Sequence, residues 1–93
     1  MYYHPVTLEF DPRKAIANVR KHGVSFAEAE PALYDPRALT REDPDAAGEP
    51  RYLTVGMGAL GRALMVCWTE RVTAVRLISA RLATASERRC YES

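Results

Sequence analysis

Cysteine, histidine and long apolar segments are all scarce in this chain of 93 residues. Its two cysteines, Cys67 and Cys90, lack the CxxC spacing of metal or redox sites, so we interpret them as a core side chain and a surface thiol. The two histidines, His4 and His22, have no Cys/His cluster beside them, and we expect no metal site. The longest apolar run, Ala63 to Trp68, is far shorter than the ~20 residues that span a bilayer, and no signal-peptide layout is visible. We expect a cytoplasmic protein without membrane contact.

Glycine-rich phosphate loops and nucleophilic triads are missing as well. Gly56, Gly58 and Gly61 fall in an expected hairpin rather than between a strand and a helix. No His–Asp arrangement near a serine is legible in the sequence. A chain of 93 residues builds one core, so we predict a single domain over residues 1–93 and no cofactor.

Charge is balanced overall but unevenly distributed, with a net charge of +1. Residues 1–50 hold six Lys/Arg against nine Asp/Glu, which gives −3, whereas residues 51–93 hold seven Arg against three acids, which gives +4. Eleven of the thirteen basic residues are arginines, and the planar guanidinium binds phosphate with two parallel hydrogen bonds. The second half of the chain therefore indicates an anionic partner.

The first part of the chain predicts a short strand followed by two helices. Apolar residues alternate over Val6–Phe10, as in a half-buried strand. Asp11 and Pro12 are typical of a helix start and Gly23 of a helix stop, so a helix is expected over Pro12–His22. Its side chains divide into an apolar side with Ala15, Ile16 and Val19 and another face with Lys14, Asn18 and Lys21.

A second helix should begin at once, because Ser25 and Glu28 have the spacing of a capping box. Its expected buried side chains are Phe26, Ala29 and Leu33. Pro31 lies in its interior, where it removes an amide hydrogen bond, so we expect a kink or an end near Tyr34. A turn, a brief strand over Ala38–Thr40 and a polar loop over Arg41–Pro50 follow.

The remaining chain is typical of antiparallel hairpins and a final helix. Strands are predicted over Tyr52–Gly56, Ala63–Thr69 and Ala74–Ala80, with the doubly apolar middle segment as the central strand. Thr84 and Glu87 form a second capping-box pattern, which opens a short helix ending near Tyr91. The fold class is therefore α+β: a short N-terminal strand and two helices packed on an antiparallel sheet of three to four further strands, with a short C-terminal helix.

Basic and acid–base groups cluster at the ends of these expected elements: Lys21 and His22; Glu49 and Arg51; Glu70 and Arg71; Arg76 and Arg81. Such groups suit RNA cleavage without metal, which needs a base for the 2′-hydroxyl, cations around the phosphate and an acid for the leaving oxygen. Each also has a structural explanation. Lys21 and His22 favourably end a helix, Glu70 and Arg71 fit a hairpin turn, and Trp68 is either a core side chain or a base-stacking platform.

Several segments together make the chain resemble the BrnT family of toxins: Asp11-Pro12-Arg13-Lys14, Asn18, Lys21-His22-Gly23-Val24-Ser25-Phe26, Glu49-Pro50-Arg51-Tyr52, Gly61-Arg62, Thr69-Glu70-Arg71, Ile78-Ser79-Ala80-Arg81, Glu87-Arg88-Arg89 and Tyr91. The resemblance implies a RelE-like fold and a ribonuclease that inhibits translation and arrests growth. It also implies neutralisation by a BrnA-like ribbon-helix-helix antitoxin, through which the toxin reaches operator DNA only indirectly. Two departures are Phe10, where the family often has Trp, and Pro31, which interrupts a helix.

We therefore hypothesise an RNA site formed by the exposed face of the sheet and the end of the first helix. Lys21 or His22 and Glu70 would transfer protons, and Arg71 and Arg81 would stabilise charge at the reaction centre. The expected RNA-binding residues are Lys14, Arg51, Arg62 and Arg76. The alternative is a non-catalytic module that docks an acidic partner segment or nucleic acid through its Arg-rich surface.

Overall fold

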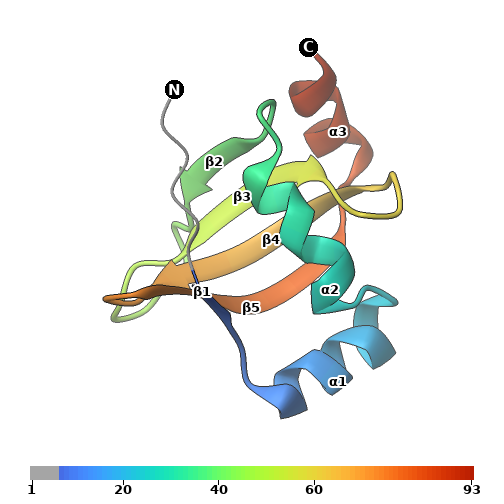
Figure 1. Ribbon diagram of the computed structural model, residues 1–93. Coiled ribbons are helices and arrows are strands. Elements are labelled where there is room, and N and C mark those ends of the chain that lie inside the picture. Colours follow the sequence, from blue (N-terminus) through green and yellow to red (C-terminus); the bar gives the residue numbers. More distant parts are fainter. Residues whose placement is uncertain (1–6) are drawn as a thin grey trace.

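The computed structural model describes residues 7–93, and its centre is a five-stranded sheet (Figure 1). The strand order is β1-β5-β4-β3-β2. The strands are β1 (Thr7–Glu9), β2 (Leu39–Glu42), β3 (Tyr52–Met57), β4 (Ala63–Glu70) and β5 (Ala74–Leu82). β2 to β5 form the expected antiparallel hairpins, and β1 adds to β5 in parallel, a pairing that the sequence left open. β2 differs from its predicted range, because Arg41 and Glu42 pair with β3 and were expected in a loop. His4 and Val6, which entered the sequence predictions, lie outside the described residues.

The helices begin and end close to the predicted residues. They are α1 (Pro12–His22), α2 (Phe26–Ala29), the 3-10 helix η1 (Glu30–Tyr34) and α3 (Ala85–Glu92). The Asp11 side chain accepts a hydrogen bond from the Arg13 amide, and Gly23 adopts φ 69° after the last turn of α1. Both signals for the first helix, and the α+β class itself, are confirmed.

Each face of the sheet carries its own cluster of buried side chains. On one face, α2 and η1 cross the strands, and Val24, Phe26, Ala29 and Ala32 pack against Leu64, Val66, Leu77 and Ala80 (Figure 1). On the other face, Tyr91 of α3 and Ala83 pack with Val55 and Met65. Leu64 and Met65 are consecutive and belong to opposite clusters, so β4 is the central strand buried on both sides, as predicted.

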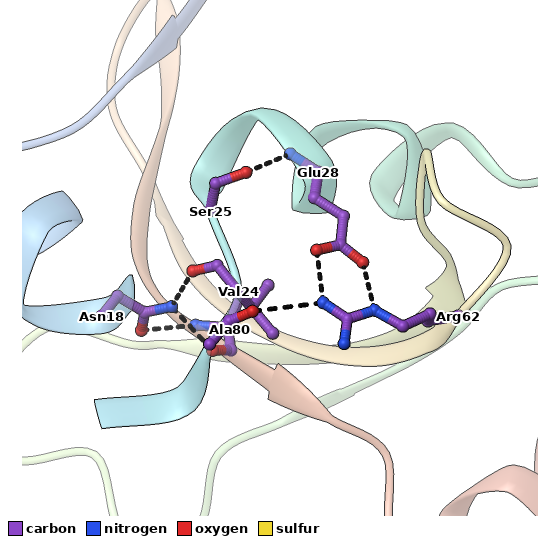
Figure 2. Close-up of polar contacts among 7 residues, drawn as sticks. Asn18, Val24, Ser25, Glu28, Arg62 and Ala80 are labelled. Atoms are coloured by element: carbon purple, nitrogen blue, oxygen red, sulfur yellow. Dashed lines mark hydrogen bonds and ion pairs between the residues drawn. The ribbon is translucent and has the colours of Figure 1, made fainter. Parts of the chain in front are cut away.

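The buried side of helix α1 is rotated from the one that its hydrophobic pattern predicts. Ala15 packs against the core as expected, and Lys14 and Lys21 are exposed. Ile16 and Val19 are 56% and 48% exposed, whereas Asn18 is buried. The reason is the surface that α1 meets. β1 pairs with β5 only at positions 74–76, so the backbone of Ala80 would otherwise remain unpaired. Asn18 donates its side-chain amide to the carbonyls of Ala80 and Val24, both at 2.8 Å, and accepts from the Ala80 amide at 3.0 Å (Figure 2).

The second helix is short, as its proline predicts, but its capping box is only half formed. Ser25 Oγ accepts from the Glu28 amide at 3.0 Å, while the Glu28 carboxylate turns away to Arg62 (Figure 2). The helix tightens into η1 at Glu30, directly before Pro31. Beneath η1, a side chain at position 56 would collide with the Ala32 carbonyl, so Gly56 permits this close packing.

Candidate functional site

Four basic residues surround a pocket of about 260 Å³ on the sheet face that carries α3, at the end of the sheet away from that helix. We call it the cationic pocket. Its lining residues are Lys14, Ala47, Glu49, Arg51, Thr69, Arg71, Arg76 and Ile78. They come from α1, the loop before β3, the ends of β4 and β5, and the turn between these two strands. Lys14 and Arg76, which are 62 positions apart in the sequence, thus contribute basic groups to one site.

The sheet register places the middle of the cationic pocket. Thr69 pairs with Arg76 on β5, and Arg51 immediately precedes Tyr52, which pairs with Trp68. Alternation along these strands therefore puts Arg51, Thr69 and Arg76 side by side on one face. The Thr69 hydroxyl donates to the Pro50 carbonyl at 2.7 Å, which fixes the loop beside Arg51.

Each arginine of the pocket is also oriented by a carboxylate. Arg71 Nη1 donates to Glu49 Oε2 at 2.7 Å, and Arg76 Nε donates to Glu9 Oε1 at 3.0 Å. Arg51 Nε lies 4.0 Å from Asp43 Oδ2. Lys14 is exposed and forms no ion pair within residues 7–93. Four basic groups thus line the pocket against one lining carboxylate, Glu49, an arrangement suited to a phosphate group.

Two arginines expected at the site are held elsewhere by bidentate ion pairs. Arg62 donates to both oxygens of Glu28, at 2.6 and 2.7 Å, and to the Gly23 carbonyl at 3.2 Å (Figure 2). Arg81 donates to both oxygens of Glu87, at 2.8 and 2.9 Å. These bonds lower the pKa of Glu28 below its ordinary value and lower the pKa of Glu87 to about 2. Neither arginine lines the cationic pocket.

Glu70 lies on the opposite face of the sheet from Arg51 and Arg76. The Tyr52 hydroxyl donates to its carboxylate at 3.4 Å. Tyr52 stacks on Trp68 with ring centroids 4.7 Å apart, and the Trp68 indole donates to Thr54 Oγ1 at 2.8 Å. Trp68 packs against the helix-covered core, which supports its interpretation as a core side chain.

Lys21 and His22 lie in the last turn of α1, outside the lining of the cationic pocket. Lys21 is exposed beside a shallow groove that Arg13, Ile16, Ala17 and Arg20 share, and His22 is half-buried. Their position at the C-terminal end of the helix matches the structural explanation, in which cations interact favourably with the helix dipole.

The sequence analysis missed the uncharged part of the lining, Thr69 and Ile78. It named Glu49 beside Arg51 but chose Glu70 for proton transfer, whereas Glu49 is the carboxylate among the basic groups. The pairing of Thr69 with Arg76 across β4 and β5 would have pointed to Thr69 had the register been known.

In the described part of the chain, no helix is long and apolar enough to cross a membrane, and no group of three or more His, Cys, Asp or Glu side chains could hold a metal ion.

Residues 10–87 match a family model described as the ribonuclease toxin BrnT of a type II toxin-antitoxin system. The chain belongs to the BrnT family. All the residues that line the cationic pocket fall inside the matched region. The crystal structure of the Brucella abortus ribonuclease toxin BrnT is similar to this BrnT chain with a TM-score of 0.63 and 24% identity, covering 86% of this chain and 99% of that one. That likeness shows the fold. No curated protein sequence matches the chain.

Proposed function

We propose that this BrnT chain is an endoribonuclease that cleaves RNA at the cationic pocket without a metal ion, and so inhibits translation and arrests growth. The observation that carries the proposal is the pocket itself, where four basic groups surround one carboxylate. The family description as a ribonuclease toxin supports the reaction class.

The chemistry follows from these groups. Glu49 accepts the proton of the 2′-hydroxyl, whose oxygen attacks the adjacent phosphorus and displaces the 5′-oxygen of the next nucleotide. The leaving 5′-oxygen takes a proton from solvent water, and Glu49 then returns its proton to solvent. Negative charge builds on the phosphate oxygens during this step. Lys14, Arg51 and Arg76 bind the phosphate and stabilise that charge, while Arg71 holds the Glu49 carboxylate in place at 2.7 Å.

This assignment keeps part of the sequence-based hypothesis and changes the rest. Lys14, Arg51 and Arg76 keep a role in phosphate binding or charge stabilisation, whereas Arg71 changes from charge stabilisation to positioning Glu49. Proton abstraction passes from Lys21, His22 and Glu70 to Glu49, because Glu49 is the carboxylate that lines the pocket. Arg62 and Arg81 are assigned to holding the fold together, since each binds both oxygens of a carboxylate and neither lines the pocket.

The partner follows from membership of a type II toxin-antitoxin family, in which a protein antitoxin neutralises the toxin. We propose a BrnA-like ribbon-helix-helix antitoxin that binds operator DNA and brings the toxin to it. We place the toxin in the cytoplasm, where its RNA substrate is available.

The test is cleavage of a single-stranded RNA by the purified, partner-free chain in the presence of EDTA. Cleavage should persist, and Glu49→Gln should lower the rate by about 100-fold or more, the usual contribution of general acid–base catalysis. Glu92→Gln, an exposed carboxylate on α3, is the matched control and should leave the rate unchanged.

Three outcomes would contradict the proposal. Loss of cleavage in EDTA would show that a metal ion is required. A large loss in Glu70→Gln together with full activity in Glu49→Gln would return proton transfer to the other face. RNA binding without any cleavage would favour the non-catalytic binding module.

A further inference from the structure

In the part of the chain that the structure describes, β2 is the last strand at one edge of the sheet, and all four of its residues are exposed. The hydrogen bonds between β2 and β3 determine which backbone groups of β2 point toward β3 and which point away from the sheet. The Asp43 amide donates to the Arg51 carbonyl at 2.8 Å, and positions 43 and 51 continue the register of β2 and β3. Since bonded and non-bonded pairs alternate in an antiparallel ladder, Leu39 and Arg41 also bond toward β3. The amides and carbonyls of Thr40 and Glu42 therefore point away from the sheet.

An apolar pocket of about 210 Å³ lies beside this edge, between the strands and α3. Its apolar lining residues are Leu39, Leu53, Val55, Met65 and Cys90, and its polar lining residues are Thr40, Arg41, Ser86 and Glu87, of which Glu87 is bound by Arg81. The volume is below the ~300–1,000 Å³ of small-molecule sites, so the pocket suits a single aliphatic side chain. An open strand edge beside a side-chain pocket is the arrangement by which sheets bind extended peptides.

We propose that an extended segment of the protein antitoxin adds to the edge of β2, with one aliphatic side chain in this pocket and an acidic residue beside Arg41. Membership of a toxin-antitoxin family supplies the protein partner. Charge complementarity indicates that the segment is acidic, since Arg41 and the lining of the cationic pocket make this face of the sheet basic.

Two other occupants fit the edge less well. In a second copy paired antiparallel so that Thr40 bonds to Glu42, the two Arg41 side chains lie directly opposite each other, which disfavours that register. RNA has no backbone that continues a strand ladder and no aliphatic group for the pocket. An extended antitoxin segment can form backbone hydrogen bonds with the edge of β2 and place an aliphatic side chain in the pocket.

The position of the edge also suggests how binding would affect activity, a consequence that rests on the proposed function. Asp43 follows β2 directly and bonds to Arg51, which lines the cationic pocket. A bound segment that continues past Glu42 therefore runs toward the proposed RNA site.

Amide hydrogen exchange of the full chain, free and in complex with the BrnA-like antitoxin proposed above, tests the pairing directly. In the free chain, Leu39 and Arg41 should be protected while Thr40 and Glu42 exchange quickly. In the complex, Thr40 and Glu42 should slow by about tenfold or more, because their amides become bonded. Unchanged exchange at both positions would overturn the proposal. Protection already present in a dimeric free chain would assign the edge to a second copy and overturn it as well.

A matched pair of variants isolates one hydrogen bond. Glu42→Pro removes an amide that points away from β3, and proline is tolerated at such positions of edge strands. Glu42→Ala removes the same side chain and keeps the amide. Antitoxin binding should weaken by about tenfold in Glu42→Pro relative to Glu42→Ala, from one lost hydrogen bond and one unpaired acceptor.

Ribonuclease activity serves as the independent readout. Both variants should cleave RNA like the wild type, so a failed ribonuclease assay leaves the edge proposal intact and testable by binding alone. Equal antitoxin affinity of Glu42→Pro and Glu42→Ala would refute strand addition at β2.

Discussion

A single amide side chain completes the sheet where a strand is missing. Asn18 is 5% exposed and makes three hydrogen bonds, two of them to the backbone of Ala80. Its amide group supplies one donor and one acceptor in the same directions as a neighbouring strand would. The position therefore requires hydrogen-bonding capacity rather than apolar surface.

This requirement predicts that Asn18→Ala and Asn18→Leu both destabilise the fold by about 3 kcal/mol, because each leaves buried backbone groups without partners. Urea unfolding measures the change. Ile16→Ala on the exposed side of the same helix is the control and should change stability by less than about 0.5 kcal/mol. A neutral or stabilising Asn18→Leu would show that the site needs apolar volume instead.

The sequence could not reveal this role, because hydrophobic periodicity assumes that a helix packs on apolar surface. α1 packs instead against a strand edge, and whether Ala80 lies at an edge depends on where β1 pairs. The same limit applies to Arg62. Nothing local distinguishes an arginine that binds an anionic ligand from one that pairs with Glu28 of a distant helix.

At the scale of elements, α3 is held by contacts at both of its ends. Thr84 and Glu87 form the complete capping box that the sequence predicted, and Arg81 binds both Glu87 oxygens. Near the other end, the Tyr91 hydroxyl donates to Asp35. Tyr91 is buried in the cluster on this face, so the helix and the β3–β4 surface are stabilised together.

The Arg81–Glu87 pair predicts a pH dependence of stability. The ion pair lowers the pKa of Glu87 from 4.5 to about 2, so the folded state holds this proton less readily than the unfolded chain. The contribution is complete above about pH 4.5 and disappears as the pH falls toward 2. Glu87→Gln, which keeps a capping acceptor, should cost about 1 kcal/mol near neutral pH and progressively less in acid.

Unfolding by urea at several pH values, for the wild type, Glu87→Gln and the exposed Glu92→Gln control, measures this difference. A gap between wild type and Glu87→Gln that stays constant down to the folded-state pKa would show that the pair does not contribute in this way.

Elements with local signals were predictable, and their long-range partners were not. Caps at Asp11, Ser25 and Thr84 and the hairpins of β3 to β5 depend on neighbouring residues, and the structure contains them. The parallel pairing of β1 with β5 joins residues 67 positions apart. It also places Glu9 on Arg76, and no spacing rule anticipates that contact.

At the scale of the whole molecule, the acidic first half and the Arg-rich second half largely neutralise each other. Among residues 7–93, four ion pairs join the two halves: Glu9 with Arg76, Glu28 with Arg62, Asp43 with Arg51, and Glu49 with Arg71. Part of the charge segregation seen in the sequence therefore serves to join the two halves of the chain in the folded protein. The cationic pocket still offers an anionic partner three tethered arginines together with Lys14.

This division predicts which lysine of α1 contributes to RNA affinity. Lys14 lines the cationic pocket and Lys21 does not, although both are exposed on one helix. With a 2′-O-methyl oligonucleotide, which cannot be cleaved through its 2′-oxygen, affinity should fall as salt rises. Lys14→Gln should reduce the slope of log affinity against log salt by about 0.7, the value for one contact to a single-strand phosphate. Lys21→Gln should keep the wild-type slope, and the reverse result would place the RNA at the end of α1, away from the pocket.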